Sequence, residues 1–110
     1  MNLNWFLESN TRNAWTQSGN VSCYVRKSVR IYNNRWIHCL DLASGSVPWE
    51  LRGQGLVTEF VKNAEFLAAE HGYRYIFIEN VLEERFCDFF RKKGYNLYSN
   101  NVTPCFIKEL

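Results

Sequence analysis

The apolar positions follow a strand-like pattern in the first part of the chain and a helix-like pattern after it. Residues 21–25, 28–32 and 36–43 are rich in β-branched and aromatic side chains. The pair Asn33-Asn34 lies between the last two segments, and asparagine tolerates the positive φ of a tight turn. These features predict an antiparallel hairpin or meander, with a β-bulge or a close approach by another group at Gly45. Residues 1–20 are polar and weakly patterned, which predicts a short strand or a short helix.

Between Gly55 and Glu70 the apolar residues recur with the period of an α-helix. Gly72 is placed to cap the C-terminus of this helix, and residues 73–78 then form a short apolar strand. A strand, a helix and a strand of these lengths form a right-handed crossover, so the two strands are expected to be parallel. The apolar face of the helix consists of Leu56, Val57, Phe60, Val61, Ala64, Leu67 and Ala68.

The last third of the chain predicts a second helix over residues 83–93, ended by Gly94, and strands over 95–98 and 102–107. With 110 residues, the chain is expected to form one domain, residues 1–110. The element order predicts an α/β (α+β) fold. Its sheet is mixed and largely antiparallel, with a parallel central strand pair and flanking helices. The aromatic C-terminal strand could pair with the edge of a second subunit, which would give a homodimer.

Composition and charge exclude several classes of protein. A net charge of +2 with scattered Lys and Arg does not favour a nucleic-acid partner, and the cluster Arg91-Lys92-Lys93 is typical of the solvated end of a helix. No apolar run approaches the roughly 20 residues that span a bilayer, and the polar start at residues 1–5, without basic residues, does not predict a signal peptide. The cysteines form no Cys-x-x-Cys pair, which argues against a metal site or redox motif and favours reduced thiols in the cytoplasm. They are Cys23, Cys39, Cys87 and Cys105.

The segment 47–56, between a predicted strand and the first helix, has the features of an anion site. Its sequence is Val-Pro-Trp-Glu-Leu-Arg-Gly-Gln-Gly-Leu. A helix N-terminus presents unpaired N–H groups, glycines let the backbone approach a phosphate closely, and Arg52 adds a charge-assisted bond. It is not a Walker loop, because Gly55 is not followed by Lys-Ser/Thr, and Thr58 breaks the dinucleotide-binding pattern. The interpretation is a pyrophosphate cradle; the alternative is an ordinary tight turn.

This segment resembles the signature of the GNAT superfamily of N-acetyltransferases, Arg/Gln-x-x-Gly-x-Gly/Ala. A second family block, an aromatic pair followed by Gly-Phe, is similar to Phe89-Phe90-Arg91-Lys92-Lys93-Gly94-Tyr95. The segment from Glu79 to Leu82, with Arg85 downstream, looks like short acetyltransferase-like proteins carried by bacteriophages. The resemblance covers about residues 36–107. It implies acetyl-CoA as cofactor and an amine acceptor, which is a protein lysine, an N-terminus or a small amine.

In the family, the pantetheine arm of coenzyme A lies between two strands that splay apart, and the pyrophosphate lies on the helix start. The resemblance therefore implies cofactor contacts from both strands and from the turn between them. The residues implied are Gly45, Ser46, Val47, Arg52, Gly53, Gln54, Gly55, Leu56, Val57, Asn80 and Arg85.

The catalytic groups of the family are only partly matched. The tyrosine that many members use to protonate the thiolate falls at Phe90, and their acidic base falls at Ala43 or Ser44, neither of which carries a carboxylate. His38 and Asp41 remain as candidate bases on the same strand. They are three positions apart, so they face opposite sides of the sheet. Two hypotheses stay open: an N-acetyltransferase, or a catalytically weak or inactive scaffold of this fold that binds a protein partner.

Overall fold

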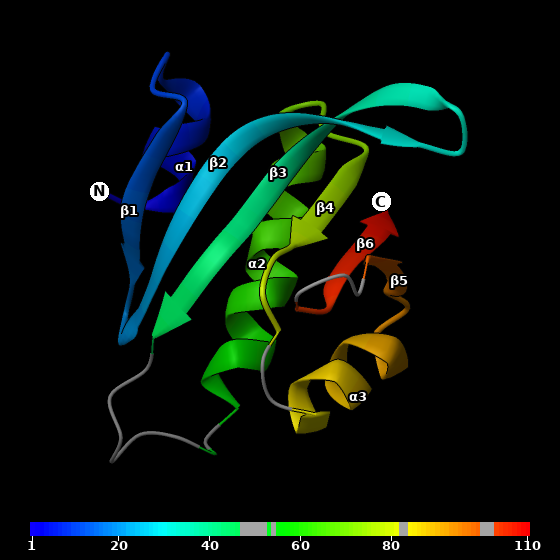
Figure 1. Ribbon diagram of the computed structural model, residues 1–110. Coiled ribbons are helices and arrows are strands. Elements are labelled where there is room, and N and C mark those ends of the chain that lie inside the picture. The colour runs from blue at the N-terminus through cyan, green and yellow to red at the C-terminus, as the bar shows by residue number, and fades with distance from the viewer. Residues whose placement is uncertain (47–52, 54, 82–83, 100–102) are drawn as a thin grey trace.

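The computed structural model describes residues 1–46, 53, 55–81, 84–99 and 103–110 (Figure 1). Six strands form one sheet in the order β1-β2-β3-β4-β6-β5. All pairs are antiparallel except β3 with β4, which confirms the predicted fold class and the parallel crossover. The elements are α1 (Leu3–Glu8), β1 (Asn13–Ser18), β2 (Val21–Tyr32), β3 (Arg35–Ser46), α2 (Leu56–Glu70), β4 (Tyr75–Ile78), α3 (Glu84–Lys92), β5 (Asn96–Ser99) and β6 (Cys105–Glu109).

The long hairpin β2–β3 is closed by the predicted Asn33-Asn34 turn. Both asparagines have positive φ, 51° and 64°, which matches the type I′ turn that suits the twist of a two-residue hairpin. The bulge lies in β3 at Ala43, because Tyr24 pairs with Ser44 and Val25 pairs with Leu42. The prediction of a bulge at Gly45 was therefore wrong by two residues. Gly45 pairs regularly with Cys23, and a bulged position does not require glycine.

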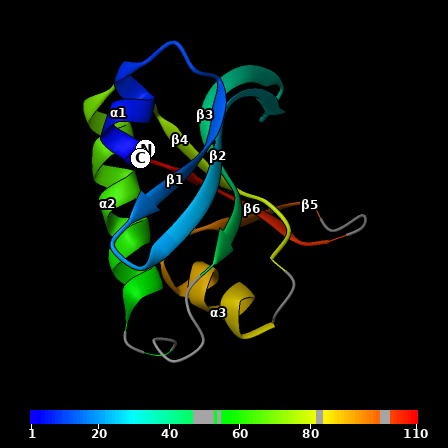
Figure 2. The ribbon, with the colours of Figure 1, turned by 90° about the vertical axis from the view of Figure 1, so that its left-hand side faces the viewer.

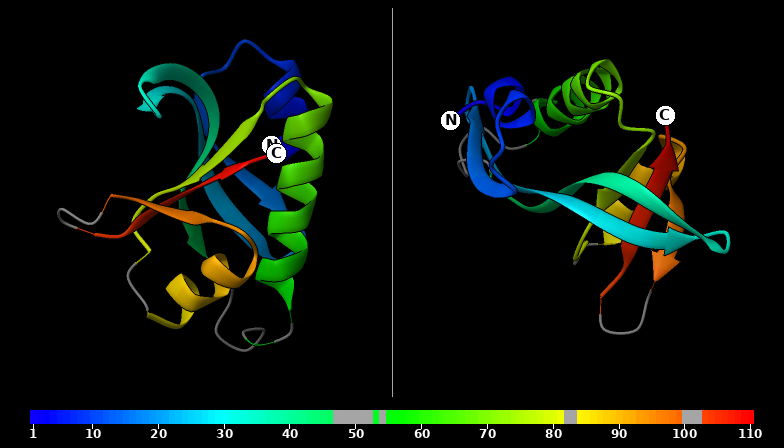
Figure 3. Two further views of the ribbon diagram at one scale, coloured as in Figure 1. Left: turned by 90° about the vertical axis from the view of Figure 1, so that its right-hand side faces the viewer. Right: turned by 90° about the horizontal axis from the view of Figure 1, so that it is seen from above.

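All three helices pack into one core on one face of the sheet. Phe6 of α1, Ala64 of α2 and Phe90 of α3 all belong to this core. Figure 3 shows α1 and α2 together on one side of the strands. Ala64 and Ala68 have no exposed surface, so these small side chains let α2 lie close to the sheet. Within the described residues, no helix is long and apolar enough to cross a membrane.

The opposite face of the sheet has a smaller core made of strand residues only. Its buried members are Ile37, Cys39, Tyr75, Phe77 and Ile107. Tyr98 closes it at one side, since its ring lies edge-on to Phe77 with centroids 4.9 Å apart and its hydroxyl donates to the carbonyl oxygen of Ile31 (2.8 Å). No helix covers this face in the part of the chain that the structure describes.

Three further expectations need correction. The N-terminal twenty residues contain both a helix and a strand, and Asn2 caps the helix by accepting from the Trp5 N–H (2.8 Å). The segments 21–25 and 28–32 are one continuous strand, β2. The C-terminal strand β6 lies between β4 and β5, so both of its edges are paired within the chain. It cannot supply the predicted pairing with a second subunit.

Candidate cofactor and active site

The parallel strands β3 and β4 separate at the point where the family resemblance places the cofactor. Their pairing ends at Leu42 and Ile78, followed by one last bond from the Glu79 N–H to the Leu42 carbonyl (3.1 Å). β3 continues to Ser46, whereas the chain after β4 turns toward β6, where the Val81 N–H bonds to the Pro104 carbonyl (2.9 Å). The edge of β3 over residues 43–46 thus has no strand partner on this side among the described residues.

Three of the predicted cofactor residues border this opening. Gly45 and Ser46 lie on the unpaired edge of β3, and Asn80 follows β4 on the other side with a φ of 57°. The side-chain oxygen of Asn80 accepts a hydrogen bond from Thr103 (2.6 Å), which fixes the amide beside β6. Backbone groups on an open strand edge pair readily with an extended ligand that carries amides.

The N-terminus of α2 has the backbone features of an anion site. Gly53 and Gly55 have positive φ, 83° and 75°, and Gly55 is the N-cap without a side-chain hydrogen bond. A Cβ added at either glycine would meet no atom of the described residues within 4 Å. Leu56 and Val57 are the first two residues of α2, and their backbone N–H groups have no hydrogen-bond acceptor within the helix. The predicted contacts Val47, Arg52 and Gln54 lie outside the described residues.

The last predicted cofactor residue, Arg85, lies in the first turn of α3. Figures 1 and 2 show the start of α3 at the same end of the molecule as the start of α2. The Arg85 guanidinium lies 5.0 Å from the centroid of the Phe86 ring.

A charged cluster lies on the strand-only face, directly beside the opening. The Arg30 guanidinium donates to Asp41 (2.7 Å) and to Glu79 (3.2 Å), and Arg26 lies 3.7 Å from Glu79. The same guanidinium lies 3.6 Å above the centroid of the Phe77 ring. Sequence analysis identified Asp41 as a candidate base and Glu79 as a candidate helix cap or substrate contact, but it missed Arg30 and the cluster itself, because only the strand register brings positions 30, 41 and 79 together.

Burial dominates the electrostatics of this cluster. Asp41 has no exposed surface, and this desolvation raises its pKa to about 7 against the opposing effect of Arg30. Burial by itself lowers the pKa of Arg30, but Asp41 together with the neighbouring acidic groups, Glu79 above all, outweighs burial and raises it. Three buried polar atoms have no partner among the described residues: Asp41 Oδ1, Arg30 Nε and Ser28 Oγ. The cluster therefore retains a free acceptor on a carboxyl group that titrates near neutral pH.

The other candidate base, His38, lies elsewhere. It is exposed, pairs with Val29 and precedes the residue at which β4 begins to pair with β3. It lies four positions before Leu42, roughly 13 Å along β3. His38 and Asp41 face opposite sides of the sheet as predicted, and only Asp41 lies beside the opening.

Phe90, at the position of the family's tyrosine, is a core residue. It is 6% exposed, and its ring contacts those of Tyr95 and Phe106, with centroids 5.3 and 6.1 Å apart. The nearby Tyr95 hydroxyl donates to Glu65 (2.7 Å), and burial raises the pKa of this phenol. Neither side chain is placed to protonate a departing thiolate.

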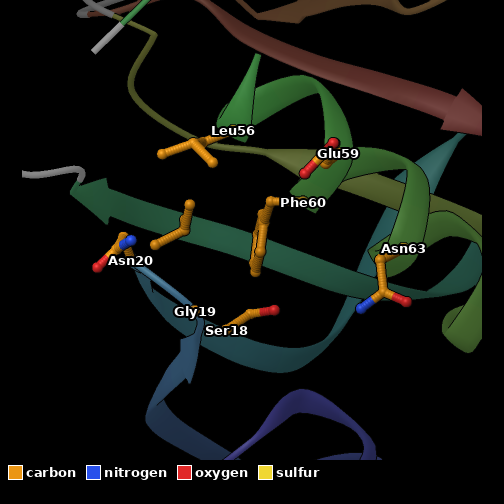
Figure 4. Close-up of a pocket in the computed structure, with 8 residues that line it drawn as sticks. Ser18, Gly19, Asn20, Leu56, Glu59, Phe60 and Asn63 are labelled. Carbon is orange, nitrogen blue, oxygen red and sulfur yellow. The ribbon is translucent and has the colours of Figure 1, made fainter. Parts of the chain in front are cut away.

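A separate hollow of about 340 Å³ lies between the β1–β2 turn and the first two turns of α2 (Figure 4). Leu56 and Phe60 form its apolar wall, and the side chains of Asn20, Glu59 and Asn63 stand around it. Sequence analysis gave no signal for this hollow, because the turn and the helix are far apart in the chain.

Comparisons with known proteins agree with the fold. No protein-family model matches the chain, and a search of curated protein sequences finds no match. Solved structures do match. A putative acetyltransferase from Agrobacterium tumefaciens matches with a TM-score of 0.65 at 14% identity. The match covers 93% of this chain and 77% of the Agrobacterium chain. A GNAT family acetyltransferase from Elizabethkingia anophelis with acetyl-CoA bound has a TM-score of 0.56 at 14% identity, covering 83% and 77%.

The AtaT toxin, in complex with acetyl-methionyl-tRNA, has a TM-score of 0.67 at 13% identity and covers 86% of this chain and 66% of its own. In another structure AtaT is bound to the C-terminus of the antitoxin AtaR and to acetyl-CoA, with 18% identity; there this chain spans 57% of the toxin's length. At these identities the likeness shows the GNAT fold. The expectation that nucleic acid is excluded as a partner finds no support, since a protein of this fold binds a tRNA.

Proposed function

We propose that this protein is an acetyl-CoA-dependent N-acetyltransferase that acetylates a primary amine. The observation that carries the proposal is the separation of β3 from β4 after Leu42 and Ile78, which leaves a strand edge open next to an uncapped helix N-terminus. Proteins of the same fold have been solved with acetyl-CoA bound, which supports this choice of cofactor. The acceptor is a protein lysine, an N-terminus or a small amine.

The residues fit the cofactor from both sides of the opening. Gly45 and Ser46 offer backbone groups to the amides of the pantetheine arm, and Asn80 borders the arm across the opening. The N–H groups that open α2, at Leu56 and Val57, hold the pyrophosphate, and Gly53 and Gly55 allow its close approach. By the family resemblance, Val47, Arg52, Gln54 and Arg85 complete the contacts.

The charged cluster supplies the proton chemistry. Bound acetyl-CoA provides an acetyl thioester, whose thiolate leaves readily because a thiol has a pKa near ~8.5. The partly exposed carboxylate of Glu79 attracts the positively charged acceptor amine. Asp41, which has no exposed surface, accepts by way of Glu79 the proton that the amine must lose before it can attack, and a base with a pKa near neutral suits this task. Phe90 donates no proton, so the thiolate leaves without an acid.

Calorimetric titration of acetyl-CoA tests the cofactor site, with two glycine variants at opposite ends of α2. Gly55→Ala and Gly72→Ala each place a side chain at positive φ in open space, so each costs a comparable ~1–2 kcal/mol of stability. Gly55→Ala also shifts the N–H groups that hold the pyrophosphate, and we expect it to weaken binding about tenfold or more. Gly72→Ala should bind like the wild type.

Equal losses in the two variants, or no binding by the folded wild-type protein, would contradict the proposal. The second outcome favours the alternative function, a scaffold of this fold that binds a protein partner. That alternative rests on Phe90, which fills the core where many acetyltransferases have their acid.

A further inference from the structure

The β2–β3 hairpin extends beyond the strands on either side of it (Figures 1 and 3). The register of β1 ends opposite Arg26, and β4 begins opposite Cys39. Residues 26–38, which form most of this projection, contain Arg26, Lys27, Arg30 and Arg35 and no acidic residue. Since Arg26 and Arg30 are paired with carboxylates, the positive charge without an ion pair among the described residues of this projection lies on Lys27 and Arg35.

One face of this projection is apolar and exposed. The side chain of Trp36 is 70% exposed, and that of Ile31, its direct partner across the hairpin, is 52% exposed. The neighbouring pair on the same face is Val29, 51% exposed, opposite His38. A tryptophan left this open beside two β-branched residues is typical of a contact surface for a ligand or partner.

A cavity of about 250 Å³ lies where the hairpin passes the corner between α2 and β4. Arg35, Trp36 and His38 line it from β3, and Arg74 lines it from the corner. No carboxylate lines it; Glu109, which pairs with Tyr75 in the sheet, is not part of its wall. The cavity therefore lies at the edge of β3 that has no strand partner among the described residues, with Arg35 on one face of the strand and Trp36 and His38 on the other.

The two arginines of the cavity differ from the other arginines of the hairpin. Arg26 and Arg30 are paired with Glu79 and Asp41. Arg35 donates one bond to the Tyr75 hydroxyl (3.1 Å), and neither Arg35 nor Arg74 forms an ion pair with any residue that the structure describes. Both guanidinium groups keep donors for an anion.

These groups together indicate a ligand that carries phosphate and a flat aromatic ring in one molecule. Arginine binds phosphate oxygens through paired N–H donors, and bases stack on exposed aromatic side chains without regard to sequence. An acidic peptide would use the arginines but has no base to stack on the indole. We propose that single-stranded nucleic acid crosses the edge of β3 at this cavity, with a phosphate at Arg35 and Arg74 on one side of the edge and a base against Trp36 on the other.

Fluorescence anisotropy with labelled octamers of uridylate and deoxythymidylate, in the absence of acetyl-CoA, tests this proposal independently of acetyl transfer. We expect Trp36→Ala to weaken binding about tenfold to a hundredfold, because the stacked base is lost. Arg35→Gln and Arg74→Gln should each lower the slope of log affinity against log salt concentration by about 0.7.

Two matched controls keep the test specific. Trp15→Ala removes a tryptophan that is 57% exposed on β1, away from the hairpin tip, and Arg91→Gln removes an exposed charge on α3; both should bind like the wild type. The proposal is overturned if the wild-type protein does not bind, or if Trp15→Ala weakens binding as much as Trp36→Ala. It is equally overturned if uridine monophosphate binds as tightly as the octamers, or if an acidic octapeptide displaces them at equal concentration.

Discussion

At the scale of single residues, the unusual feature is a fully buried carboxyl group on a strand that borders the proposed cofactor opening. Asp41 accepts from Arg30, which in turn lies on the Phe77 ring and bridges to Glu79. Replacement of a buried ion pair by apolar residues is often neutral or stabilising, so stability alone gives little reason for such a pair. The proposed role in proton transfer gives a reason, because the proposed acetyl transfer needs a base near neutral pH.

The pKa of Asp41 predicts a specific dependence of stability on pH. The native carboxyl holds its proton up to about pH 7, whereas the unfolded chain releases it near pH ~3.9. Between these values the native state binds more protons, so this group makes the protein less stable as pH rises, by about 1.4 kcal/mol for each unit of pKa difference. Asp41→Asn removes the effect, since its amide does not titrate.

Urea unfolding of both proteins from pH 4 to pH 8 measures this difference. We expect the stability of the wild type relative to Asp41→Asn to fall as pH rises toward 7 and to stay constant above it. A difference that does not change with pH would show that Asp41 ionises at the same pH in the folded and unfolded states.

At the scale of elements, short backbone features decide where strands and helices begin and end. The Asn33-Asn34 turn joins two 12-residue strands, and both of its residues are in the left-handed region. Glycine adopts this conformation at no steric cost, and Asn-Gly is the preferred sequence for such a turn.

We therefore expect Asn34→Gly to raise the stability by about 0.5 kcal/mol and Asn34→Val to lower it by about 1–2 kcal/mol. Thermal unfolding followed by circular dichroism measures both changes. If both variants had the midpoint of the wild type, the turn would not hold the hairpin in this register.

At the scale of the whole molecule, the sheet separates two cores that differ in how they are covered. Cys23 and Cys87 belong to the helix-covered core, Cys39 belongs to the strand-only core, and Cys105 lies partly exposed at its border. Burial raises the pKa of Cys23 to about 12 and that of Cys39 to about 11, so both remain thiols at pH 8.

This arrangement predicts selective alkylation. Iodoacetamide at pH 8 should modify Cys105 first in the folded protein and all four cysteines in urea, because only a thiolate that is accessible to reagent reacts. Mass spectrometry of tryptic peptides identifies the modified residues. Labelling of Cys39 as fast as Cys105 would show that the strand-only core is open to solvent.

The local patterns of the sequence were sufficient for most elements and for the fold class. The 3.6-residue period of α2, the asparagine turn and the glycines after both long helices act over a few neighbouring residues, so they can be read without the tertiary structure. The position of the β3 bulge could not be read this way. It depends on which residues of β2 and β3 face each other, and Ala43 has no local feature that marks it.

The sequence by itself thus determined a mixed sheet with one parallel crossover and a glycine-rich helix start, because these follow from local conformational preference. Only the tertiary structure decided which side chains meet. Strand register joined Arg30, Asp41 and Glu79 into one cluster, and it put Arg35 and Trp36 beside Arg74 at the hairpin. The net charge of +2 is a sum over the whole molecule, whereas binding depends on which charged side chains lie on the same surface. Positions along the chain do not show which charges share a surface, because that depends on the fold.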